Sequence, residues 1–125
     1  MISNKIAWAA LAAAFALMLW PQSAEGAVAK GRSKVQKVLN DAEQFGGCIA
    51  YVANIPEGLN CGQNSSNVGW ISFDCAGRYS SPSKGRQSFN LATMAMLTNY
   101  RLSFALDDRE KFGNFCHAYQ TSLGK

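Results

Sequence analysis

The sequence predicts an α+β fold, with two helices packed on a small antiparallel sheet of about four strands in the order α-β-β-α-β-β. Three observations lead to this prediction. Segments with helical apolar spacing alternate with β-rich segments, turn-forming residues separate them, and four cysteines are available to staple them by disulfides. The 125-residue chain is long enough for one such domain.

An apolar segment near the amino terminus predicts export. Lys5 precedes an uninterrupted apolar run from Ile6 to Trp20, and the helix breaker Pro21 follows. This is the pattern of a secretory signal peptide. The run has about 15 residues, fewer than the roughly 20 that a membrane-spanning helix needs, so we expect no stable membrane insertion after cleavage.

Two small-x-small sequences mark where the signal peptide would be cleaved, after Gly26 or after Ala29. We divide the chain at the second site, into a signal peptide of residues 1–29 and a single domain of residues 30–125. The expected location is the periplasm or the cell exterior.

All four cysteines lie in the exported part, where an oxidising compartment favours two disulfide bonds. Four cysteines allow three pairings, and the sequence does not choose between them. Our preferred pairing is Cys48 with Cys116 and Cys61 with Cys75, because Cys61 lies in a turn-rich loop and Cys75 ends the strand that follows. Each bridge is expected to stabilise the domain by about 2–4 kcal/mol.

Two segments are predicted to be helical. In the first, Ser33-Lys34-Val35-Gln36 fits a capping box, apolar residues at helical spacing follow as far as Phe45, and Gly46-Gly47 would end the helix. The second has Ser81 as its cap and Pro82 at the favoured first position, and it runs to about Thr98.

Four β-rich segments supply the predicted sheet. The polar sequence DDREKFGN, which begins at Asp107-Asp108, is predicted to be a charged hairpin turn before the last strand. The predicted strands are Cys48–Ile55, Val68–Cys75, Tyr100–Asp107 and Phe115–Tyr119.

The polar corner before the second helix is the first candidate site. Ser81-Pro82-Ser83-Lys84 has the S-x-x-K spacing of the penicillin-recognising enzymes, but the sequence lacks their S-D-N and K-T-G elements. Lys84 also precedes Gly85, which is out of register for a phosphate loop. What remains is a helix amino terminus with Arg78, Lys84 and Arg86 beside it, a predicted site for an acidic ligand such as a phosphate or a sialylated glycan.

Trp70 is the second candidate, because it falls on the less apolar face of its strand beside Ser72 and Asp74. Exposed aromatic rings are common contact points for ligands and protein partners. The candidate ligand-binding residues are therefore Trp70, Asp74, Arg78, Lys84 and Arg86.

Few residues are suited to catalysis. His117 is the only histidine, and its neighbour Cys116 points to the opposite face of a strand, so the two do not form a nucleophile and base pair. We interpret Asp107-Asp108 as part of a turn rather than as paired catalytic carboxylates. No calcium-loop pattern is present. We expect no catalytic residue, no metal and no cofactor.

The segments GGCIAYV, GWISFDCAG, SFNLATMAML and DDREKFGNFCHA together resemble a group of small exported, largely uncharacterised proteins of Gram-negative bacteria. More distantly, the order strand, long helix, two strands is similar to the carboxy-terminal half of the binding subunits of pentameric bacterial toxins. That likeness implies an OB-fold and glycan binding, but it carries no sugar-binding residue over to this chain. The sequence departs from it by a helix predicted before the first strand and by too few strands for a full barrel.

We therefore expect an exported, disulfide-stabilised binding module, a toxin-like subunit that recognises a glycan or an acidic ligand and for which homo-oligomer formation is left open. The alternative is a periplasmic inhibitor or docking protein for another envelope or secreted protein. An enzyme is the least favoured class. Nucleic acid is not an expected partner, because the formal net charge of +4 is far below that of dedicated nucleic-acid binders.

Overall fold

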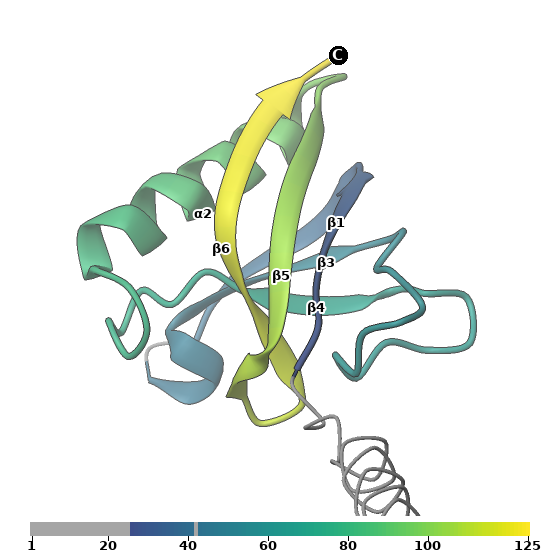
Figure 1. Cartoon of the computed structure of the whole chain (residues 1–125). Coiled ribbons are helices and arrows are strands. Elements are labelled where there is room, and N and C mark those ends of the chain that lie inside the picture. Colours follow the sequence, from purple (N-terminus) through teal and green to yellow (C-terminus); the bar gives the residue numbers. More distant parts are fainter. Residues whose placement is uncertain (1–25, 42) are drawn as a thin grey trace, which may run out of the picture.

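The computed structural model describes residues 26–41 and 43–125 (Figure 1). Residues 1–25 of the predicted signal peptide lie outside the described part. Among the described helices, none combines the length and the apolar character needed to cross a membrane. The elements are β1 (Val28–Ser33), β2 (Val35–Asn40), the short 3-10 helix η1 (Gln44–Gly46), β3 (Cys48–Val52), β4 (Gly69–Ser72), α2 (Pro82–Leu97), β5 (Arg101–Phe112) and β6 (Phe115–Gly124).

The strands form one six-stranded mixed sheet in the order β1-β5-β6-β4-β3-β2. Neighbouring strands are antiparallel except β4 and β6, which run parallel where Ser72 pairs with His117. The predicted fold, two helices on an antiparallel sheet of about four strands, is therefore wrong. Within the described residues a larger sheet is accompanied by one α-helix, α2.

The first predicted helix is replaced by β1 and β2. The register of β2 against β3 shifts between Val35 and Lys37, which marks a β-bulge. A bulge inserts one extra residue, so Val35 and Val38, three positions apart, both pack on the core. In a regular strand such a pair would face opposite sides. The apolar spacing taken for a helix is therefore that of a bulged strand.

β1 and β2 are separated by Lys34 alone, yet they lie at opposite ends of the strand order. The amino-terminal segment is thus one long bent strand, which pairs with β5 before the bend and with β3 after it. Hydrogen bonds fix the bend: Ser33 Oγ accepts from the Ala53 amide at 2.9 Å, and Asn54 Nδ2 donates to the Arg32 carbonyl at 2.8 Å.

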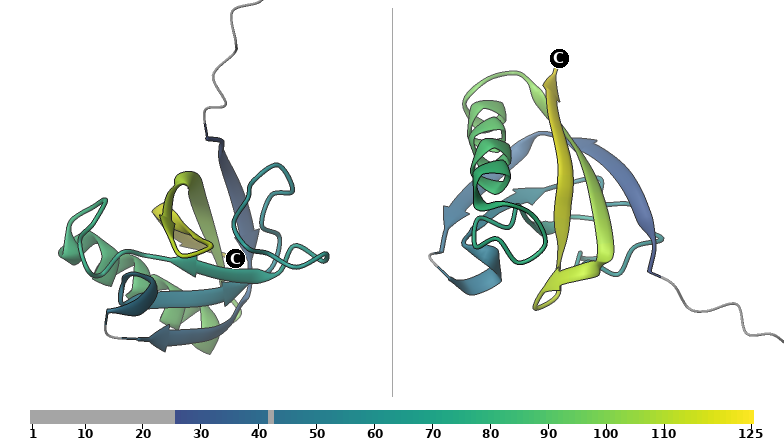
Figure 2. Two further views of the ribbon diagram at one scale, coloured as in Figure 1. Left: turned by 90° about the horizontal axis from the view of Figure 1, so that it is seen from below. Right: turned by 60° about the vertical axis from the view of Figure 1, so that its left-hand side comes forward.

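This bent strand closes the sheet into a barrel. With β1 and β2 counted as one strand, the barrel has five strands in a Greek-key order, which is the architecture of the OB-fold. Figure 2 shows the strands curving around a common interior. The expectation that the chain has too few strands for a full barrel is therefore wrong, because the segment predicted as a helix supplies the missing strand.

Helix α2 packs against β2, β3, β5 and β6. Its start agrees with the prediction: Ser81 is the N-cap, and its Oγ accepts from the Lys84 amide at 3.2 Å. The residues that it buries are small, which lets the helix approach the sheet closely. At Gly85 a Cβ would lie 2.7 Å from the Phe73 carbonyl oxygen, so only glycine fits there. The buried positions are Gly85, Ser88, Ala92 and Ala95.

The disulfides join Cys48 to Cys75 and Cys61 to Cys116, with Cα–Cα distances of 5.7 and 5.0 Å. The preferred pairing of Cys48 with Cys116 and Cys61 with Cys75 is therefore wrong. The reason is strand order: β3 lies directly beside β4, where the Phe73 amide donates to the Cys48 carbonyl, while β4 separates β3 from β6. Two disulfides are consistent with an exported protein.

The predicted charged turn at Asp107-Asp108 is also wrong, because β5 continues to Phe112 and the hairpin turns at residues 113–114. Irregular register between Asp107 and Lys111 shows that the polar residues form a bulged continuation of the strand. Asp108 instead holds the start of β1: its Oδ1 accepts from the Ala27 amide at 2.7 Å, and its own amide donates to the Ala27 carbonyl.

Candidate ligand-binding site

Two partly exposed aromatic rings lie side by side on the outer surface of the barrel. Tyr51 of β3 and Trp70 of β4 are cross-strand partners, and their ring centroids are 5.2 Å apart at an interplanar angle of 58°. Their strand neighbours Ala50 and Ile71 are fully buried in the core, so Tyr51 and Trp70 face outward. The pair offers an apolar surface with a phenol hydroxyl and an indole N–H as polar groups.

Lys37 extends this pair onto β2. It is the register partner of Tyr51, and its Nζ lies 5.7 Å from the centroid of the Tyr51 ring. An ammonium group at this distance is attracted to the ring face. The row Lys37, Tyr51, Trp70 therefore combines two stacking surfaces with a charged hydrogen-bond donor.

Loop 43–47, which precedes β3, adds a second aromatic pair. Phe45 is 39% exposed, and its ring centroid lies 4.7 Å from that of Phe115 at the start of β6. The loop folds over the outer side of β4, where Ser72 Oγ donates to the Phe45 carbonyl at 2.7 Å. Below, "the outer aromatic face" means Phe45, Tyr51, Trp70 and Phe115.

The backbone of Phe45 is strained. Its φ is 51°, in the left-handed region that favours glycine, and Gly46 and Gly47 follow with φ of 85° and 90°. Such a conformation costs a non-glycine residue about 1–3 kcal/mol, and it is found most often at binding and catalytic sites. The loop therefore keeps a large aromatic side chain at a position where the backbone conformation favours glycine.

Asp74, a predicted ligand-binding residue, is instead fully buried and organises the corner before α2. Its Oδ1 accepts from the amides of Gly77 and Arg78, and its Oδ2 accepts from those of Tyr79 and Ser80, at 2.6–3.0 Å. With four amide donors, this carboxylate has no lone pair directed to a ligand. The polar corner is thus built around a structural carboxylate.

The predicted basic residues are exposed near the start of α2. Arg78 lies over the Phe112 ring at 4.6 Å and donates to the Lys111 carbonyl at 3.4 Å, while Lys84 and Arg86 lie in the first turns of the helix. Trp70 is near the opposite end of β4 from this corner, so the predicted residues do not form one cluster.

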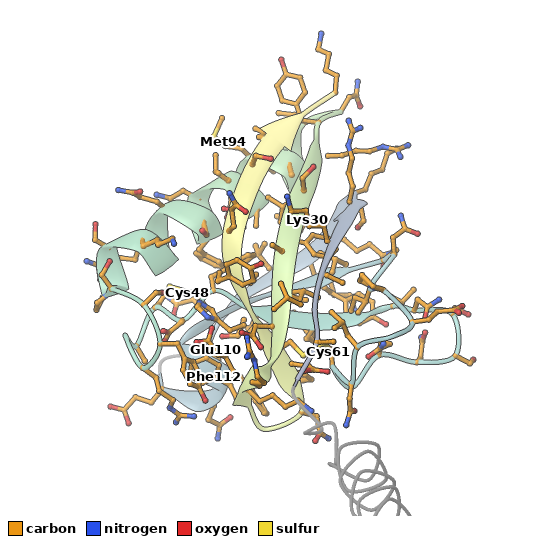
Figure 3. All side chains as sticks on the ribbon, viewed as in Figure 1. Lys30, Cys48, Cys61, Met94, Glu110 and Phe112 are labelled. Atoms are coloured by element: carbon orange, nitrogen blue, oxygen red, sulfur yellow. A yellow bond between two sulfur atoms is a disulfide. The ribbon has the colours of Figure 1, made fainter. Side chains whose placement is uncertain are left out.

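His117, the only histidine, lies in a network that sequence reasoning missed. It faces the outer side of β6 but is only 1% exposed, and its Nδ1 lies 2.9 Å from Glu110 Oε1. Its Nε2 lies 3.5 Å from Ser80 Oγ, and the Tyr79 ring stacks on the imidazole at 5.8 Å. Figure 3 shows Glu110 and Phe112 at the same end of the barrel.

Ser80, His117 and Glu110 are arranged in the order of a nucleophile, a base and a carboxylate that orients the base. The contact between Ser80 and His117 is long, however, and the side chain of His117 is 2% exposed beneath Tyr79. A substrate would reach Nε2 only if Tyr79 moved away. In this geometry the buried His117 links β6 to β5 through Glu110, and to the corner before α2 through Ser80 and Tyr79.

Asp107, also on β5, is hydrogen-bonded to Arg109. Its two oxygens accept from the backbone amide, Nε and Nη2 of Arg109 at 2.9–3.0 Å. These side-chain hydrogen bonds hold the pKa of Asp107 below its ordinary value, against the opposing effect of burial.

Among residues 26–41 and 43–125, no three His, Cys, Asp or Glu side chains are grouped in a way that could hold a metal ion. The alternation of residues along the sequence indicated that Trp70 faces outward. It did not show that Tyr51 and Lys37 lie beside Trp70, because the pairing register of β2, β3 and β4 is set in the folded barrel.

Searches against family models, curated proteins and solved structures return no significant match to the chain.

Proposed function

We propose that this chain is an exported glycan-binding module of the OB type, which holds its ligand on the outer aromatic face and acts in the periplasm or outside the cell. The observation that carries the proposal is the Tyr51–Trp70 pair, with ring centroids 5.2 Å apart and Lys37 beside it. Flat aromatic rings at the surface match the apolar faces of sugar rings, and the lysine can donate to sugar hydroxyls.

The position of the pair supports the same assignment. In OB-folds the face of the second and third strands, with the loops that follow the first and fourth strands, binds oligosaccharides and oligonucleotides. Here β3 and β4 are the second and third strands of the barrel and carry Tyr51 and Trp70. Loop 43–47 lies between the first and second strands and carries Phe45, and Phe115 follows the loop after the fourth strand.

The choice of a glycan over a nucleic acid rests on charge and on export. A groove that tracks a phosphate backbone needs a row of cations, whereas among the described residues one cation, Lys37, lies against an aromatic ring of this face. The two disulfides make the scaffold rigid and suit an oxidising compartment. A rigid site lowers the entropy lost on binding.

A glycan array tests the proposal. The oxidised chain from Ala27 onward is applied to neutral and acidic oligosaccharides, beside the variants Trp70→Ala and Tyr51→Ala. Loss of one of these rings is expected to weaken binding by about tenfold, since truncation of an important contact residue costs more than about 1 kcal/mol. The matched control is Tyr100→Ala, an aromatic truncation outside the outer aromatic face.

Absence of bound glycans, or binding unchanged in both variants, would refute the proposal. A single-stranded oligo-dT probe is run in parallel. Tighter binding to oligo-dT than to every oligosaccharide, sensitive to the same variants, would assign the face to nucleic acid instead.

A further inference from the structure

We propose a second ligand site on a different part of the barrel wall, a groove across β1, β5 and β6 that binds a small ligand carrying an oxyanion. The groove encloses about 420 Å³, a volume in the range of small-molecule sites. Its lining comes from β1, β5 and β6, whereas Tyr51 and Trp70 lie on β3 and β4. The proposal is therefore independent of the outer aromatic face.

The sheet register explains the shape of this groove. Ser103 and Ala105 are short residues on the central strand, β5, so they form a low floor. Longer side chains line the groove on both sides of this floor: Lys30 and Arg32 on β1, and Gln120 on β6. Ala105 is only 2% exposed, which fits a floor enclosed by taller neighbours. The two cross-strand rows are Lys30, Ala105, Gln120 and Arg32, Ser103, Ser122.

The polar groups of the lining point to an anion. Lys30 and Arg32 supply two cationic donors on one wall, and Lys30 can be followed in Figure 3. Ser103, Gln120 and Ser122 add neutral donors, and no Asp or Glu is among the described residues that line the groove. Charge-assisted hydrogen bonds from lysine and arginine to carboxylate or phosphate oxygens are about twice as strong as neutral ones.

Arg32 lies at the rim of the groove and is exposed. Its Nη2 donates to a main-chain oxygen of Lys125, and its backbone carbonyl accepts from Asn54 Nδ2 at 2.8 Å. The guanidinium has further N–H donors that can contact an oxyanion. The volume accommodates a ligand of about monosaccharide size. A sugar acid and a phosphate share this chemistry.

Amide NMR titration of the oxidised chain from Ala27 onward tests the site with three probes: D-glucuronate, inorganic phosphate and uncharged D-glucose. We expect saturable shifts at residues 103–105 and 120–122 with at least one anion and none with glucose. Lys30→Met and Arg32→Gln are expected to weaken anion binding by roughly tenfold or more. The matched controls Lys84→Met and Arg86→Gln, on α2, are expected to bind as the parent does.

Glucuronate binding more tightly than phosphate would support the groove and identify a sugar acid, and the reverse order would support it and identify a phosphate. Three results would overturn the proposal: no saturable shift with either anion, equal shifts with glucose, or shifts at the start of α2 that only the Lys84 and Arg86 variants abolish. Preserved peak dispersion in each variant shows that folding is intact. Because the groove is read from shifts at residues 103–105 and 120–122, failure of the groove and failure of the outer aromatic face give different results.

Discussion

His117 Nδ1 lies 2.9 Å from Glu110 Oε1, and this contact joins β6 to the bulged end of β5. The side chain of His117 is 2% exposed and that of Glu110 is 30% exposed, so the contact is largely shielded from water. Glu110→Ala would therefore leave a buried ring nitrogen without its hydrogen-bond partner. The expected loss is about 1–3 kcal/mol of unfolding free energy, measured by urea denaturation.

The control for this prediction is Glu43→Ala, which removes an exposed carboxylate from loop 43–47. It is expected to change the unfolding free energy by less than about 0.5 kcal/mol. Equal effects of the two substitutions would contradict the assigned role of Glu110.

The lowered pKa of Asp107 is expected to make the stability of the fold depend on pH in the acid range. Because hydrogen bonds from Arg109 lower its pKa, the ionised carboxylate favours the folded state. Its contribution is fully present above the ordinary pKa of about 3.9 and is lost as the pH falls below that value through the lowered pKa. The stability difference between the parent and Asp107→Asn should be constant from about pH 7 to 5 and should close below about pH 4.

Urea midpoints across this pH range measure that difference. In the background of Arg109→Gln, the effect of Asp107→Asn on stability should be smaller at pH 7, since the donor that lowers the pKa is gone. A stability difference that is the same at pH 7 and at pH 3 would contradict the assignment.

The start of β1 predicts where the proposed signal peptide would be cleaved. Val28 and Ala29 pair with Asp107 and Leu106, and Ala27 exchanges hydrogen bonds with Asp108. Cleavage after Ala29 would remove all of these contacts, whereas cleavage after Gly26 would keep them. We therefore expect intact mass of the exported product to give Ala27 as its first residue. A product that begins at Lys30 would show that this end of β1 is dispensable.

The disulfide pairing is testable by peptide mapping under non-reducing conditions. Proteases that cut after Lys, Arg, Glu and aromatic residues place the four cysteines on separate fragments. The fragment with Cys48 should be linked to that with Cys75, and the fragment with Cys61 to that with Cys116. A link between Cys48 and Cys116 would contradict the strand order, because β4 lies between β3 and β6.

Local signals predict some elements correctly from the sequence. Helix α2 is predicted because Ser81 and Pro82 are start signals that act within a few residues. The outward position of Trp70 follows from simple alternation with Ile71 and Phe73. These features depend on neighbours along the chain.

The predictions are wrong where the local structure depends on segments that are distant in the sequence. Val35 and Val38 mimic helical spacing because a bulge lies between Val35 and Lys37, and that bulge is stabilised by pairing with β3. Asp74 has the sequence context of a surface carboxylate, but the amides of residues 77–80 turn back onto it. The partner of each cysteine depends on which strands are neighbours in the closed barrel.

The most direct test of the outer aromatic face uses Trp70 itself. From Ala27 onward Trp70 is the only tryptophan of the chain, so intrinsic fluorescence reports on its environment alone. Titration with the oligosaccharide that gives the strongest array signal is expected to produce a saturable change in emission. Tyr51→Ala should lower the affinity obtained from this titration by about tenfold, and Tyr100→Ala should leave it unchanged. Binding of that oligosaccharide with no change in Trp70 emission would place the ligand elsewhere and contradict the account.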